Sequence, residues 1–246
     1  MKTNLLKFIF ITSLVALSSI LYLVQYLAFH DSRDTVYYLL QDIAFLPLQV
    51  LLVTLILERV LRSMEKQERL NKQNMVIGTF FSQFGVALLK RFSNWDTSIE
   101  SARNELIVGK TWPDEKFRSL SSRLAGYRGE FQAGNIDFNE LKKMMAAERG
   151  FLLGLLENQN LLEHEEFTEL LWATFHLLEE LAYRQDFSRL PESDLDHLVG
   201  DMNRAYILLI CQWIIYMRHL KKNYPYLFSL ALRTNPFDKN ATIVVQ

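Results

Sequence analysis

The sequence predicts an all-α protein in which a two-helix transmembrane hairpin is followed by a cytoplasmic multi-helix bundle. Two long apolar runs lie close together near the N-terminus, at residues 8–29 and 36–57. Helix-capping signals and apolar residues at helical spacing recur through the rest of the chain. No alternating apolar and polar pattern of the kind that pairs strands is evident.

Each apolar run is long enough to span a bilayer. Residues 8–29 contain no charged side chain, and residues 36–57 contain only Asp42. Each run has 22 residues, and a helix of that length rises roughly 33 Å, enough to cross a hydrocarbon core of about 30 Å. Because only residues 30–35 separate the two runs, we expect a tight transmembrane hairpin over residues 1–57.

Basic residues predict the orientation of this hairpin. Lys2 and Lys7 flank the first run, and residues 58–73 after the second run contain five lysines and arginines. Basic residues near the ends of a span remain in the cytoplasm. We therefore expect a multi-pass protein of the cell inner (plasma) membrane, with its N-terminus and C-terminal domain cytoplasmic and the lipid bilayer as a partner. A cleaved signal peptide fits less well, because its apolar region is usually about 7–15 residues long.

Residues 58–73 are predicted to form a juxtamembrane helical stalk that continues the second span. Acidic and basic residues pair four positions apart with the acid first, as in Glu58–Arg62, which is the favourable order in a helix. The stalk is either a short coiled coil that relays a signal or a helix that lies on anionic headgroups. A C-terminal tail is expected at residues 236–246.

Residues 74–235 are predicted to form the cytoplasmic α-helical domain. Gly78 and Gly85 are expected to be close-packing points in its first helix. Residues 205–217 are apolar on almost every side, yet they are too few to cross a bilayer, so they should form the central core helix around Trp213. The helices are expected at about 75–92, 97–109, 111–127, 137–157, 165–185, 192–222 and 225–232.

Asp42 is the one ionisable residue inside a predicted span. Such a residue suggests an ion or proton path formed by several hairpins together. The simpler interpretation is a polar clasp that fixes the hairpin, because Tyr22 and Gln25 of the antiparallel first span lie at the same depth.

The segment 157–201 is strongly acidic, with twelve acidic and two basic residues. This composition suggests a docking face for a basic protein partner. If helix 165–185 folds back on helix 192–222, His176 comes level with Asp201 and Glu180 comes level with His197.

Helical phase argues against a metal site at these two pairs. At about 100° per residue, His197 and Asp201 are expected to point away from Leu195, Val199 and Met202, and His176 and Glu180 away from the apolar face of their own helix. We therefore expect solvated surface charges, no metal ligands and no bound cofactor.

Other site signatures are missing from the sequence. There is no P-loop, dinucleotide-binding, nucleophile-elbow or zincin motif, so no catalytic or cofactor-binding residue is predicted. The formal net charge of −1 gives no basic footprint for nucleic acid. The single cysteine, Cys211, lies among apolar neighbours and is expected to be a core thiol.

Four segments, at residues 45–57, 74–85, 224–230 and 235–237, resemble segments of an uncharacterised family of small prokaryotic membrane proteins. The resemblance implies a shared two-helix anchor and cytoplasmic helical domain, and it brings no known activity. The leading functional hypothesis is a membrane-anchored interaction, scaffold or signal-relay module. The alternative is a homo-oligomeric channel or transporter subunit that uses Asp42, and an enzyme of unrecognised helical type comes third.

Overall fold

The computed structural model describes residues 12–13, 16–24, 26–27, 32–159, 161 and 164–244. Within these residues every regular element is a helix, apart from an isolated bridge between Asp96 and Phe131. The prediction of an all-α chain is therefore confirmed. The chain divides into two compact units, residues 1–66 and 67–246, and each is described by itself.

The first unit is helical wherever it is described, at residues 12–13, 16–24, 26–27 and from residue 32 onward. Helix α2, Ser32–Phe80, begins in this unit and contains the apolar segment Val36–Lys66. The most apolar 18-residue stretch of this segment has a mean hydropathy of 2.0, and none of that stretch is buried. By length and composition alone it could cross a membrane. Part of the predicted first span, residues 8–29, lies outside the described residues.

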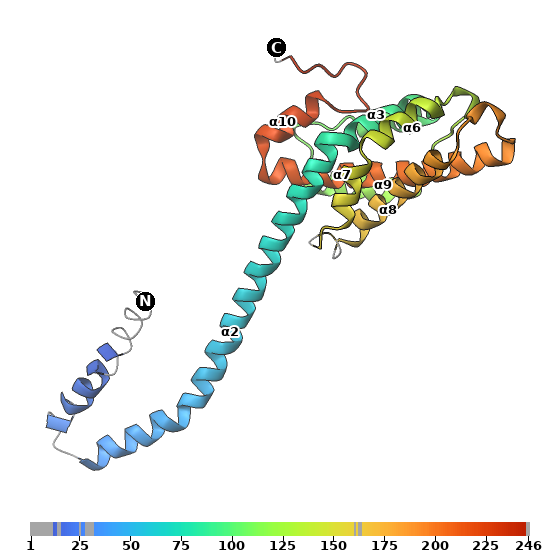
Figure 1. Cartoon of the computed structure of the whole chain (residues 1–246). Helices are drawn as coiled ribbons and strands as arrows, with labels where there is room; N and C mark the ends of the chain where they lie inside the picture. Colours follow the sequence, from blue (N-terminus) through green and yellow to red (C-terminus); the bar gives the residue numbers. More distant parts are fainter. Residues whose placement is uncertain are drawn as a thin grey trace. The chain divides into compact units, whose positions relative to one another are not determined.

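The second unit begins inside α2 and continues through a series of helices (Figure 1). They are the π-helix η1 (Phe81–Gly85), α3 (Val86–Trp95), α4 (Ile99–Leu106), α5 (Asp114–Leu124), the short 3₁₀ helix η2 (Ala133–Asn135), α6 (Phe138–Ala147), α7 (Arg149–Leu156), α8 (Glu165–Tyr183), the 3₁₀ helix η3 (Phe187–Arg189), α9 (Glu192–Asn223) and α10 (Pro225–Arg233).

Helix α9 is the centre of the second unit, and it packs against α3, α5, α8 and α10. Its middle section is buried, as predicted, at Ala205, Tyr206, Leu209, Ile210, Trp213, Ile214 and Met217. The helix is long and apolar enough to cross a membrane, but 56% of its most apolar 18-residue stretch is buried inside the protein. Its apolar character is therefore that of a core helix.

Several helix boundaries differ from those expected. The predicted helix 137–157 is divided at Glu148 into α6 and α7, and η1 interrupts the predicted helix 75–92. Asp137 caps α6, because its side chain accepts a hydrogen bond from the backbone N–H of Glu140 at 2.8 Å. Helix α5 begins later than the predicted helix 111–127, and its N-cap is Pro113.

The C-terminal end of the chain contributes to the core. Phe237, which we predicted to lie in a tail beyond the domain, is 0% exposed. Arg103 donates a hydrogen bond to the carbonyl oxygen of Phe237 at 2.8 Å, and the Asn235 side chain donates to the carbonyl oxygen of Leu106 at 3.0 Å. The packed part of the chain thus extends past the expected boundary at residue 235.

Candidate functional site

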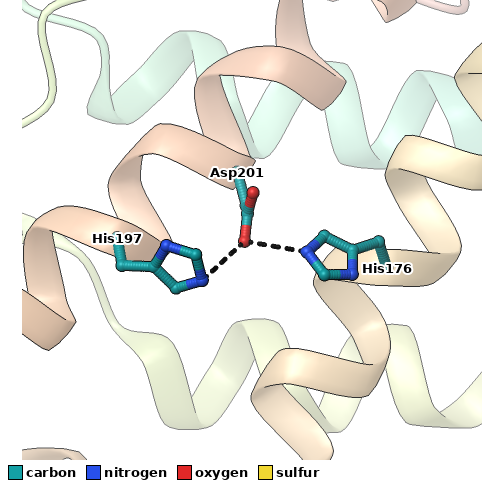
Figure 2. Close-up of side chains that lie close together, drawn as sticks. All are labelled: His176, His197 and Asp201. Carbon is teal, nitrogen blue, oxygen red and sulfur yellow. Dashed lines mark ion pairs between the residues drawn. The ribbon is translucent and has the colours of Figure 1, made fainter.

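A buried carboxyl group between two histidines is the most unusual polar feature of the second unit (Figure 2). The Asp201 side chain is only 4% exposed, and its Oδ2 lies 3.3 Å from Nε2 of His176 and 3.4 Å from Nε2 of His197. The other oxygen, Oδ1, lies 3.3 Å from the guanidinium group of Arg204. Oδ2 has no hydrogen-bond partner in the protein.

Two packed helices position these side chains. His197 and Asp201 are one turn apart on α9, and His176 comes from α8. Figure 2 shows both imidazole rings pointing toward the carboxyl group between the helices. The histidine side chains are about half exposed, at 46% for His176 and 53% for His197, so the cluster opens to solvent on its histidine side.

A second ion-pair network supports the cluster from one side. Arg184 donates two hydrogen bonds to Asp194, at 2.8 and 2.6 Å, and one to Glu180 at 2.6 Å. The oxygens of Glu180 lie 3.9 Å from His176 and 3.8 Å from His197. Hydrogen bonds donated by Arg184 lower the pKa of both carboxyl groups, and the hydrogen bonds that Arg184 donates to Asp194 raise the pKa of Arg184. The two acids are therefore ionised at neutral pH.

The expected register of α8 against α9 is observed, because His176 meets Asp201 and Glu180 approaches His197. The expected phase of Asp201 was wrong. The buried line of α9 runs through Leu198, Met202 and Ala205, each 0% exposed, and Asp201 lies on this line.

The error came from the residues used to define the buried face. Leu195 and Val199, which were expected to mark it, are only partly buried. A rotation of the apolar face by part of a turn brings Asp201 from the surface into the interface with α8.

The cluster has the donor set of a metal centre. One imidazole nitrogen from each of His176 and His197 and one carboxylate oxygen from Asp201 lie within 4.8 Å of one another. Imidazole nitrogen and carboxylate oxygen are common ligands of transition-metal ions.

The hydroxyl group of Tyr22 in the first unit donates a hydrogen bond to Oδ2 of Asp42 at 2.9 Å. This contact is the one expected for a polar clasp between the two apolar runs. Gln25, the other expected partner, lies outside the described residues.

The acidic segment 157–201 is partly neutralised within the protein. Five of its acidic side chains lie in ion pairs with basic groups: Glu179, Glu180, Asp186, Asp194 and Asp201.

A groove of about 570 Å³ lies between the end of α2, η1, the end of α9 and α10. Its lining includes Met75, Tyr226 and Leu230, whose side chains are exposed. No cluster of ionisable groups of the kind seen at Asp201 lies along it among the described residues.

Comparison with known proteins identifies the family of the chain. Two family models match it: residues 2–61 match "MJ1433, N-terminal helical domain", and residues 69–233 match "Uncharacterized protein MJ1433, C-terminal helical domain". The chain is also 45% identical, over 231 residues, to uncharacterized protein MJ1433 of Methanocaldococcus jannaschii, and the match covers 94% of this chain and 93% of that protein.

No solved structure matches the chain. The two family models meet in the same stretch of α2 in which the two compact units divide. The expected resemblance to an uncharacterised family is confirmed, and neither family description mentions a membrane. The chain belongs to the family of uncharacterized protein MJ1433, with a match to both its N-terminal and its C-terminal helical domain.

Proposed function

We propose that this protein is a membrane-anchored interaction, scaffold or signal-relay module. Residues 1–57 form a transmembrane hairpin with both chain ends in the cytoplasm, and the helical domain after it binds a protein partner at the membrane surface.

One observation carries the anchor: between Val36 and Leu57, no part of the chain that the structure describes covers the large apolar side chains of α2. From Val36 to Leu57 the large apolar residues are exposed, in most cases by more than half. Water-exposed apolar surface of this length is unfavourable in a soluble monomer, whereas a lipid environment removes the cost. The helix in this stretch pairs its backbone groups internally, as a span must, except at the carbonyl of Ile43, for which Pro47 has no N–H to donate.

The hydrogen bond between Tyr22 and Asp42 supports a clasp within one hairpin. A polar group in hydrocarbon is stabilised by such a contact, with a typical gain of about 0.6 kcal/mol and a maximum near 1.7 kcal/mol. A conduction path would need Asp42 to face a pore built by several copies. The contact favours the anchored module over the channel or transporter subunit.

The topology is tested by labelling from outside the cell. In intact cells a Ser32→Cys variant should react with a membrane-impermeant maleimide, and a reporter fused after Gln246 should be active only in the cytoplasm. The unchanged chain is the matched control, because its one cysteine, Cys211, is largely buried.

Labelling of a cysteine placed at the C-terminus, without labelling at residue 32, would refute the N-in, C-in topology. Recovery of the chain from the soluble fraction after cell lysis would refute the anchor itself. Cross-linking in membranes followed by mass spectrometry then separates the functions. A different protein at fixed stoichiometry supports the scaffold, and a closed ring of this chain supports the channel.

A further inference from the structure

We infer that His176, His197 and Asp201 bind one divalent transition-metal ion, of which Zn²⁺ is the best probe, and that this ion joins α8 to α9. The sequence alone predicted surface charges here. The inference is independent of the membrane anchor, because every residue that carries it lies in the second unit.

The distances suit a metal centre. Ligand atoms held about 2.0–2.1 Å from a tetrahedral zinc ion are roughly 3.3–3.4 Å apart. Oδ2 of Asp201 lies 3.3 Å from one imidazole nitrogen and 3.4 Å from the other, so two of the three distances between ligand atoms already match those of a zinc site. The third distance, between the nitrogens of His176 and His197, is within 4.8 Å, and a rotation of the half-exposed rings shortens it.

Oδ2 of Asp201 gives a second, independent reason for a cation. A buried polar atom normally has a hydrogen-bond partner, and each exception needs an explanation. This oxygen has none in the protein, although the side chain is 96% buried and the oxygen faces both imidazoles. A metal ion bound between the two rings would coordinate this oxygen directly.

The charges around the cluster also favour a cation. The ion pairs here contain three carboxyl groups, from Glu180, Asp194 and Asp201, and two guanidinium groups, from Arg184 and Arg204. The carboxyl groups in these ion pairs outnumber the guanidinium groups by one, which favours a cation. Glu180 is held by Arg184 next to both rings, where it attracts the ion without needing to be a ligand.

Three protein ligands would leave at least one coordination position for water. Metal centres that act chemically keep such an open position, whereas structural zinc sites are closed by four protein ligands. The exposed histidine side of the cluster is where this position opens.

Zinc binding to the full-length protein in detergent, without a polyhistidine tag, tests the inference. After removal of bound metal with a chelator, isothermal titration should give one Zn²⁺ per chain. Co²⁺ should produce the visible ligand-field absorption of a low-symmetry centre with nitrogen ligands. His176→Ala, His197→Ala and Asp201→Asn should each lower the affinity at least about 10- to 100-fold, the loss seen when even an outer-shell partner is removed.

The matched control is Asp196→Asn, which removes an exposed acid beside His197 and should keep the unchanged affinity. Excess Zn²⁺ should raise the melting temperature of the unchanged chain and of Asp196→Asn, because a ligand stabilises the state that binds it. The two histidine variants should lose this increase, and both remove side chains that are about half exposed. Binding of less than one ion per chain, or equal affinity in all four variants, would overturn the inference.

Discussion

The carboxyl group of Asp201 is buried, so each contact to its two oxygens affects the stability of the fold. Removing a polar group from water without a compensating contact costs about 1–3 kcal/mol by mutational measures, and a charge costs more. One oxygen of Asp201 faces Arg204 from the next turn of α9, and the other depends on His176 from a different helix. A sliding of α8 along α9 would separate Asp201 from His176, so this contact favours the observed register of the two helices.

The thiol of Cys211 illustrates the opposite effect of burial, the suppression of reactivity. Burial, with a smaller contribution from the charge of Glu166, raises the pKa of this thiol to about 11. Because the thiolate is the nucleophile, we expect iodoacetamide at pH 7.5 to modify Cys211 much more slowly in the folded protein than in guanidinium chloride. Mass spectrometry of the adduct over time measures both rates, and equal rates would show that the thiol is accessible.

The members of the Asp201 cluster could be predicted from the sequence, and the burial of Asp201 could not. The spacing of residues along two antiparallel helices was enough to place His176 opposite Asp201. The buried side of α9, however, depends on which neighbours cover it. Residues 205–217 are apolar all round, so the sequence alone does not fix the rotation of the helix about its own axis.

The π-helix η1 marks the place where α2 enters the core. A π-helix widens the turn by one residue, and here it brings Phe80, Phe81 and Phe84 into the core with at most 2% exposure. The rings of Phe80 and Phe81 pack edge to face, with centroids 5.2 Å apart. Gly85 closes this turn, and the rings occupy the space where its side chain would be.

Gly85→Ala should therefore destabilise the second unit. A Cβ atom at residue 85 would lie 2.8 Å from ring carbons of both Phe80 and Phe81, and neither buried ring can move away freely. Overpacking of this kind costs about 1–3 kcal/mol, and the better helix propensity of alanine returns up to about 1 kcal/mol. The melting temperature of the full chain, followed by circular dichroism, should fall.

Gly154→Ala in α7 is the matched control for the same chemical change. No heavy atom lies within 4 Å of the Cβ position at Gly154, so only the gain in helix propensity remains, about 0.5–1 kcal/mol. Its melting temperature should stay the same or rise. If the two variants change the melting temperature equally, the rings of Phe80 and Phe81 do not pack as closely against Gly85 as described.

Helix positions were predictable where a local signal determines them. The cap at Asp137, the start of α9 after Pro191 and the start of α10 at Pro225 follow from single residues whose backbone preferences are strong. The break between α6 and α7 at Glu148 has no Gly or Pro signal at that residue. Both helices pack against α8, and such long-range packing cannot be read from a single sequence.

At the scale of the whole molecule, the core is assembled from segments far apart in the chain. Tyr206 of α9 packs against the rings of Phe92 from α3 and Phe131, with centroids 5.8 and 5.5 Å away. Trp213 of α9 has an aromatic partner in Phe237, from the C-terminal segment. Helix α8 also packs against α9, and its Glu166 accepts a hydrogen bond from the buried Gln212.

The last prediction concerns the C-terminal segment as a structural part of the second unit. The rings of Trp213 and Phe237 lie 5.2 Å apart between centroids, and both side chains are at most 1% exposed. Removal of a buried aromatic side chain typically costs about 3–5 kcal/mol, a large share of the roughly 5–15 kcal/mol that stabilises a domain. A chain that ends at Asn235 should thus melt far below the full chain, whereas one that ends at Ala241 should not.

Trp213→Ala should cause a loss of similar size, and Glu169→Ala, a change at an exposed position of α8, should be nearly silent. Trp213→Ala combined with Phe237→Ala should cost less than the sum of the two single changes, because each removes the same ring contact. The melting temperatures of the four variants and the two shortened chains decide the question. If the chain ending at Asn235 is as stable as the full chain, Phe237 does not belong to the core. Additive losses would instead mean that the two rings stabilise the fold independently.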